Sequence, residues 1–306
     1  ENLKDISFIN HMPELASLGI TDSKILLLDP LVGKESLKEL VLVDNGEVRD
    51  YNPVGTLTGL ETLVINKYTN QDDPDLTALT GLKHGEFHGM MGIRFLGSLT
   101  GLEELKVQGC NVDQPSVIAS LPALKKLTYR KNWGNSDDLS FLAGCQGLTY
   151  LDMNHSEFYG DVSYAFNLPA LETLILDKSS FEVKFDRLQD NPALKALSLN
   201  HVKLYKNIEM WSDGMVRSIN YDDVLLDEYT SFLGHYPSLE YLSLRGNQLT
   251  DLQFAAGLKN LRELDVTDNY VTDTHVLDQL EYLGKDSTVK RPMADVDWID
   301  TVEDSH

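Results

Sequence analysis

The sequence predicts an α/β solenoid, a single array of short strand-and-turn units, and three observations support this fold class. A motif Leu-x-x-Leu-x-apolar recurs along the 306 residues, its starts are almost evenly spaced, and small polar residues follow it at a fixed position. A regular period of about 20 to 50 residues is typical of repeat arrays. Nine stretches match the motif outright: Leu37/Leu40/Leu42, Leu60/Leu63/Ile65, Leu102/Leu105/Val107, Leu124/Leu127/Tyr129, Leu148/Leu151/Met153, Leu171/Leu174/Leu176, Leu194/Leu197/Leu199, Leu239/Leu242/Leu244 and Leu261/Leu264/Val266.

Three weaker matches lie in phase between these nine, about 20 to 24 residues from their neighbours, which is the period expected for such units. One unit cannot bury its own leucines, but units stacked about 4.8 Å apart share one continuous core. We therefore expect a single repeat domain of about twelve units over residues 1–283, followed by a C-terminal cap or tail over residues 284–306. The weaker units are Leu15/Leu18/Ile20, Leu82/Gly85/Phe87 and Val216/Ile219/Tyr221.

The turns that follow the motif carry residues that bond to the backbone. An Asp after the strand, as at Asp75, Asp251 and Asp273, can cap a short turn, which predicts 3₁₀ pieces on the outer side. The ninth residue of a unit, counted from its first leucine, should hydrogen-bond the loop backbone. Seven units fit, at Asn45, Cys110, Asn132, Ser156, Ser179, Asn247 and Asn269, whereas local irregularity is expected at Tyr68, Met90, Val202 and Val224.

These motifs resemble the leucine-rich repeat family, and the spacing is most similar to the 22-residue subclass found in internalins, which are bacterial surface proteins that bind host receptors. The resemblance extends over nearly the whole chain. It implies a right-handed arc with a parallel sheet on the concave face and short 3₁₀ turns or loops on the convex face. It also implies that partners bind to the concave sheet.

The ends and one internal segment depart from the regular pattern. Asp5 lies ten residues before Leu15, as Asp251 does before Leu261, so the chain begins within a unit, and we expect more protein upstream. The stretch 275–283 has apolar residues at helical spacing and is interpreted as the closing cap. Repeat consensus is poorest over 204–228, which predicts either a divergent unit or a bulging loop.

Composition narrows the classes of partner. The formal net charge is -22, which disfavours nucleic acid and anionic lipid. No stretch approaches the roughly 18 to 20 apolar residues needed to cross a bilayer, so no transmembrane segment is predicted. The two cysteines, Cys110 and Cys145, are too few for a disulfide framework and lack the spacing of a zinc site.

Two clusters are expected on the concave face, where the third, fifth and seventh residues of each unit point outward. One is apolar and near the N-terminal end, with two interpretations, a contact site or the strand propensity of valine on a half-exposed sheet: Val41, Val43 and Val64. The other combines cations and aromatic residues typical of interfaces, although its bases could simply balance Glu104 and Asp152 across the sheet: Lys106, Lys126, Arg130, Trp133, Tyr150, Asp152 and His155.

Catalytic and metal-binding motifs find little support. His84, Glu86 and His88 share one face of a predicted strand, but residues i and i+4 of a strand are about 13 Å apart, too far to share one zinc ion. One histidine with Glu86 or Glu104 remains open as a metal site. The chain has no nucleotide-binding loop, nucleophile elbow or EF-hand loop, so we expect neither enzymatic activity nor a cofactor.

The sequence therefore predicts a non-catalytic, monomeric module for protein–protein recognition, the surface-exposed part of a larger bacterial protein that is secreted or displayed at the cell surface. The setting rests on the internalin resemblance. The main alternative is a cytoplasmic scaffold or regulatory adaptor. A ubiquitin-transfer effector would need a catalytic domain beyond these residues, and a carbohydrate site would need aromatic residues closer together than Tyr150 and Tyr241.

Overall fold

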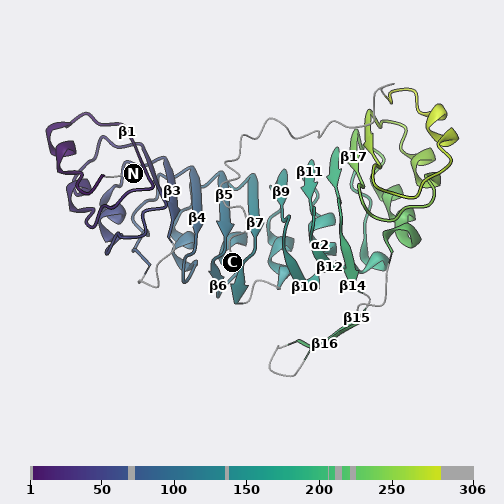
Figure 1. Cartoon of the computed structure of the whole chain (residues 1–306), viewed down its shortest axis with the longest axis horizontal. Helices are drawn as coiled ribbons and strands as arrows, with labels where there is room; N and C mark the ends of the chain where they lie inside the picture. The colour runs from purple at the N-terminus through teal and green to yellow at the C-terminus, as the bar shows by residue number, and fades with distance from the viewer. Residues whose placement is uncertain are drawn as a thin grey trace.

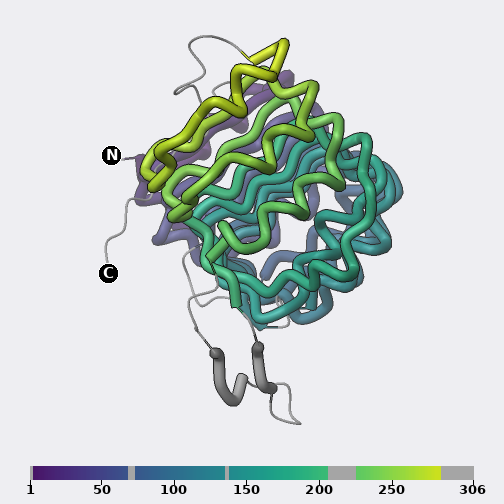
Figure 2. Tube along the Cα trace, turned by 90° about the vertical axis from the view of Figure 1, so that its right-hand side faces the viewer, coloured from purple at the N-terminus to yellow at the C-terminus, as the bar shows by residue number. Residues whose placement is uncertain are grey.

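The chain forms one parallel sheet, wound as a coil, in a computed structural model that describes residues 3–67, 73–134, 138–205, 207–210, 216–220 and 225–283. Within these ranges the main sheet has 11 strands. Figures 1 and 2 show the chain winding as a coil, with the strands side by side on one face. In sheet order they are β1 Ser17–Thr21, β2 Glu39–Val43, β3 Thr62–Asn66, β4 His84–His88, β5 Glu104–Gln108, β7 Lys126–Arg130, β9 Tyr150–Asp152, β11 Thr173–Ile175, β13 Ala196–Ser198, β17 Tyr241–Ser243 and β18 Glu263–Asp265.

The register of the sheet follows the repeat. Each motif position pairs with the same position of the next unit, as in Leu40 with Leu63 and Leu105 with Leu127. The fourth and sixth residues of most units are fully buried and form one continuous core. Since a slip of one residue would turn every leucine outward, this burial fixes the register.

Short helical turns cover the convex side of the sheet, and most of them are 3₁₀. The predicted caps are present: Asp251 Oδ1 accepts a hydrogen bond from the backbone N–H of Gln253 at 2.8 Å, and Asp75 accepts one from Thr77 at 3.0 Å. The predicted solenoid is therefore confirmed. The turns are η1 Ser7–His11, η2 Asp29–Leu31, η3 Asn52–Thr56, η4 Arg94–Ser98, α1 Ser116–Ala119, η5 Leu139–Gly144, α2 Ser163–Phe166, η6 Phe185–Arg187, η7 Leu226–His235, η8 Gln253–Gly257 and η9 His275–Gln279.

The ninth residues form the predicted ladder between units. Buried Asn45 accepts a hydrogen bond from the Ser23 hydroxyl at 2.6 Å and donates one to the carbonyl of Ile20 at 2.7 Å. The chain stays regular at Val202, because its N–H donates to Asn247 of the following unit at 3.0 Å. Tyr68 and Val224 lie outside the described residues.

Smaller sheets flank the main one beyond the ends of its strands. The first comprises β10 Glu157–Asp161, β12 Ser180–Glu182 and β14 Lys203–Tyr205, and the second pairs β6 Asn111–Val112 with β8 Trp133–Gly134 (Figure 1). They form where successive loops leave the main sheet at the same point of the repeat.

The predicted tenth unit at Val216/Ile219/Tyr221 is wrong. Strand β16, Val216–Asn220, pairs antiparallel with β15, Asn207–Met210, in a hairpin that projects beside β14 (Figure 1). Strand β13 instead pairs directly with β17, with Leu197 opposite Leu242. Of the two interpretations of 204–228, the bulging loop fits β15 and β16, which lie outside the main sheet, whereas Leu204 and Leu226 at the two ends of the segment belong to the core.

The last helical turn of the described residues is η9. Val276 and Leu280 are buried there, and Leu277 and Leu283 pack partly against the core. The expected tail, 284–306, lies outside the described residues. Among the helices of the described part of the chain, none combines the length and apolar character that a bilayer span requires.

Candidate interaction surface

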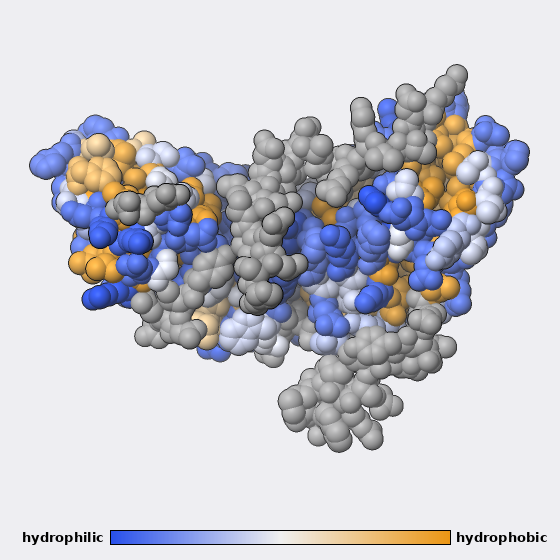
Figure 3. Space-filling model, in the orientation of Figure 1, coloured by the Kyte–Doolittle hydropathy of each residue, from blue (hydrophilic) through white to orange (hydrophobic). Residues whose placement is uncertain are grey.

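The strand side of the coil presents alternate side chains of the main sheet, as the repeat predicts. Hydrophilic residues gather over its middle strands and hydrophobic ones toward both ends of the array (Figure 3). The three predicted valines lie at the N-terminal end, with Val41 of β2 directly paired with Val64 of β3. Val41, Val43 and Val64 are all half-buried, so they form a short apolar track on the sheet.

Acids and bases pair across β4, β5 and β7. Lys106 Nζ lies 2.8 Å from Glu86 Oε2, and Glu104 Oε2 lies 3.4 Å from His84 Nδ1 and 3.9 Å from Lys126 Nζ. The alternative that bases balance acids across the sheet therefore describes these contacts. The side chains of Lys126 and His84 are the more exposed members of these pairs, at 57% and 50%, so both reach the surface that a partner would meet.

The Glu86 carboxylate has the most perturbed acidity of this group. Burial alone would raise its pKa, but hydrogen bonds from His88 and Lys106 and their charges outweigh burial and lower the pKa to about 2. Burial lowers the pKa of Lys106. Glu86 is thus an ionised, fully engaged group at neutral pH.

Arg130 and Asp152 form the most buried ion pair of the surface. Arg130 Nε lies 3.2 Å from Asp152 Oδ1 while its Nη2 contacts the other carboxylate oxygen, and the Asp152 side chain is 1% exposed. Oδ1 also accepts the backbone N–H of Asn154 at 3.0 Å. Burial and the Asp152 charge raise the pKa of neighbouring Tyr150. This constellation is held rigidly within the sheet.

Trp133 and His155, expected on the concave face, lie outside the main sheet. Lys131 and His155 both adopt the left-handed region, with φ of 48° and 51°, which turns the chain away after the strand. Trp133 therefore lies in β8, with 48% of its surface exposed, and the His155 ring contacts Asn154 Oδ1 at 3.1 Å. The cation and aromatic cluster is reduced to Lys106, Lys126, Arg130, Tyr150 and Asp152.

The two histidines of β4 turn to different carboxylates. His84 contacts Glu104, whereas His88 Nε2 lies 2.8 Å from Glu86 Oε1. No group of three or more His, Cys, Asp or Glu side chains in the described ranges is arranged to hold a metal ion. The histidines act here as partners of acids on the sheet.

A polar network that sequence patterns did not indicate joins the later strands. Asp177 Oδ1 accepts hydrogen bonds from the Ser198 hydroxyl at 2.6 Å and from the Asn200 backbone at 2.9 Å, and Asn200 Oδ1 accepts from Ser243 at 2.6 Å. These side chains bind backbone N–H groups that would otherwise extend the ladder, and the main-sheet strands β9, β11, β13, β17 and β18 are three residues long instead of five. The signal was the run of Asp and Asn at the seventh position.

Comparison with known proteins agrees with this architecture. A family model described as "Leucine Rich repeats (2 copies)" matches residues 237–279. No curated protein matches the chain. The chain therefore has a leucine-rich-repeat fold, and residues 237–279 match the repeats of that family.

Solved structures place the fold near the internalins. An internalin from Listeria monocytogenes is 19% identical with a TM-score of 0.70, over 93% of this chain and 83% of that one. A leucine-rich-repeat protein from Leptospira interrogans is 18% identical with a TM-score of 0.59, over 92% of this chain and 74% of that one. The ectodomain of a plant membrane receptor kinase from Arabidopsis thaliana is 14% identical with a TM-score of 0.50, over 92% and 39%. The chain is internalin-like in fold.

Proposed function

We propose that this chain is a non-catalytic protein–protein recognition module that binds its partner, as a monomer, through the concave sheet. Leucine-rich-repeat folds generally mediate protein–protein interaction, and solenoids use their extended concave surfaces to do so. The observation that carries the proposal is the continuous strand face of the 11-stranded sheet, whose outward side chains are held in a fixed register.

The contact region within this face centres on β2 to β9. It combines the apolar track Val41, Val43 and Val64 with exposed Lys126 and half-buried Tyr150. Apolar anchors surrounded by polar groups are the usual composition of a protein interface. The ion pairs of the region hold their side chains in fixed positions on the sheet, and their members are Lys106, Arg130 and Asp152. We place two further residues, Trp133 and His155, at the edge of the contact region.

The proposed setting is the secreted or cell-surface part of a larger bacterial protein. Its support is the fold similarity to an internalin of Listeria monocytogenes and to a leucine-rich-repeat protein of Leptospira interrogans, both bacterial. In the alternative setting, a cytoplasmic scaffold, the same face would bind an intracellular partner. Fractionation of the producing cells separates the two settings.

Site-specific photo-crosslinking tests the binding face. A photoreactive residue is introduced on the sheet at Lys126 of β7 or Glu39 of β2, and on the convex side at Gln253 of η8, as an exposed control. The protein is irradiated with candidate partner fractions, and adducts are identified by mass spectrometry. A partner captured from both sheet positions but not from Gln253 supports the proposal. Capture from Gln253 alone contradicts it.

A further inference from the structure

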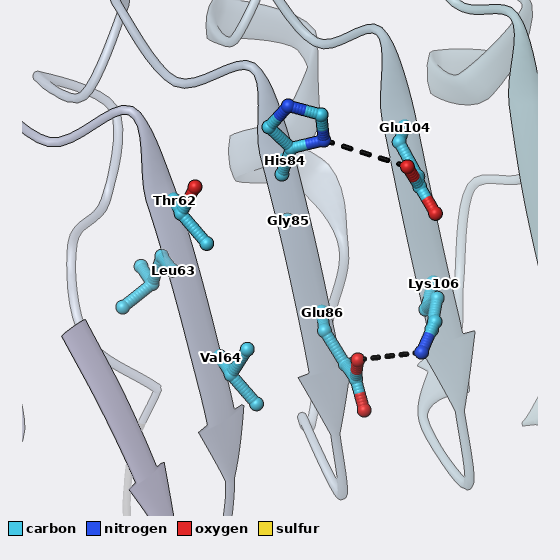
Figure 4. A pocket seen from close by; sticks show the side chains of 8 residues that line it. All are labelled: Thr62, Leu63, Val64, His84, Gly85, Glu86, Glu104 and Lys106. Carbon is cyan, nitrogen blue, oxygen red and sulfur yellow. Dashed lines mark hydrogen bonds and ion pairs between the residues drawn. The ribbon is translucent and has the colours of Figure 1, made fainter. Parts of the chain in front are cut away.

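A hollow of about 180 Å³ opens on the concave face between β3 and β4, away from the Arg130–Asp152 pair. Its wall on the β3 side is made by Thr62 and Val64, and Val64 continues the apolar track from Val41 (Figure 4). The full lining is Thr62, Leu63, Val64, His84, Gly85, Glu86, Glu104 and Lys106.

The hollow forms because two side chains on β4 lean toward β5 and leave the space beside β3 unfilled. The side chains of His84 and Glu86 on β4 turn toward β5, where His84 contacts Glu104 and Glu86 contacts Lys106 (Figure 4). The β3 side offers only short, branched side chains. Beneath it Gly85 contributes backbone alone, since the ring of Phe87 lies 2.7 Å from where its Cβ would be. The hollow is therefore closed toward the core and open toward a partner.

Its size selects the kind of occupant. Sites for small molecules typically measure about 300 to 1,000 Å³, well above this volume. A cavity of about 150 Å³ suffices for one benzene ring. A single side chain presented by a protein thus fits the space, whereas a metabolite of ordinary size does not.

The charges at the rim select its chemistry. An acidic side chain would meet the carboxylates of Glu86 and Glu104. A cationic one would find both carboxylates already paired, Glu86 with Lys106 and Glu104 with His84 and Lys126, and would have to displace one of these partners. A neutral ring can instead pack on Val64 and give its polar hydrogen to the rim. We infer that this hollow is the anchor site for one tyrosine or tryptophan side chain of the partner, an inference that rests on the proposed function.

Side-chain analogues test the hollow without knowledge of the partner. The methyl resonances of Val64 and, as a distant control, of Val266 are followed by NMR during titration with 4-ethylphenol, 3-methylindole, n-butylguanidinium and butyrate. We expect the two aromatic probes to shift Val64 saturably, with dissociation constants in the millimolar range expected of such small ligands, and to leave Val266 unchanged. The charged probes should not bind at the same concentrations.

Filling the hollow provides the matched comparison. Thr62→Phe on β3 should weaken 4-ethylphenol binding by roughly tenfold or more, with a smaller loss for Thr62→Leu. Thr173→Phe, at the same position of β11 and similarly half-buried, should leave it unchanged. Absent binding of the aromatic probes, equal binding of a charged probe, or unchanged binding after both Thr62 substitutions would overturn the inference. Because free probes are measured, these outcomes are independent of the crosslinking result.

Discussion

The Arg130–Asp152 pair should contribute more to stability than the other ion pairs of the concave face. The Asp152 side chain is 1% exposed and that of Arg130 20%, and the two groups share two contacts. Lys126 and Glu104, one strand earlier, are 57% and 28% exposed and 3.9 Å apart. The same pair of charges thus occurs on adjacent strands in a buried and an exposed setting.

The expected magnitudes differ accordingly. Asp152→Ala leaves a guanidinium largely buried without its anion and removes the acceptor of the Asn154 N–H, so the free energy of unfolding should fall by about 3 to 5 kcal/mol. Glu104→Ala breaks only exposed contacts and should cost about 0 to 1 kcal/mol. Because both ion pairs involve β7, the two variants are compared at nearly the same place along the array, and burial is the main difference between them.

Urea denaturation followed by far-UV circular dichroism measures both values. The decisive variant is the double substitution Arg130→Met with Asp152→Leu, which replaces both charges by apolar groups of similar volume. It should be less destabilised than Asp152→Ala, since no charge is left buried without a partner. If Asp152→Ala costs no more than Glu104→Ala, or if the double variant is the least stable, the pair does not act as described.

Three further predictions concern backbone, acidity and the insertion. Gly89→Ala should lower the thermal unfolding temperature more than Gly109→Ala does. Both glycines have positive φ, at 67° and 60°, but only at Gly89 would the new Cβ clash with a backbone carbonyl oxygen, that of Lys67. Equal losses would contradict this reasoning. Glu86 has its pKa lowered to about 2, so it stabilises the fold above its unfolded pKa of about 4.3 and loses this contribution as the pH falls toward 2. The native protein should therefore be more stable than Glu86→Gln by on the order of 2 kcal/mol at neutral pH, and acid denaturation should show this difference vanishing over that range. A difference that stays constant with pH would refute the prediction. Replacing 207–220 by a short Gly/Ser linker should keep the circular dichroism spectrum and shift stability by about 1 kcal/mol or less, whereas loss of the sheet signal would show that the hairpin is integral.

The sheet was predictable because its determinants are local and repeated. Every unit must bury the same leucines, so the motif alone locates the strands and their register, as at Leu63 and Leu105. The sequence left 204–228 open between a divergent unit and a bulging loop, because Val216, Ile219 and Tyr221 keep the period of the repeat. Only the pairing of β13 with β17 shows that the sheet omits this segment.

For the candidate surface, the sequence predicted which positions of each strand point outward but not which side chains contact one another. Ion pairs between the same row of adjacent units, such as Glu104 with Lys126, follow from register. The misplacement of Trp133 follows from the eighth residue of the unit, which adopts positive φ at Lys131 and His155 and at Gly89 and Gly109. The glycines at that position were the available sign that the strand ends there.

Pairing also changes which feature of the face can anchor a partner. Lys106, Lys126 and Arg130 supply three cations, and Glu86, Glu104 and Asp152 supply three carboxylates in contact with them, so the centre of the face is balanced within a chain of net charge -22. An acidic partner would have to separate these pairs before gaining any attraction, and buried pairs are costly to break. The apolar track and its hollow carry no such cost. Under the proposed function we therefore expect the track and the hollow to supply the affinity and the surrounding charges to discriminate among partners.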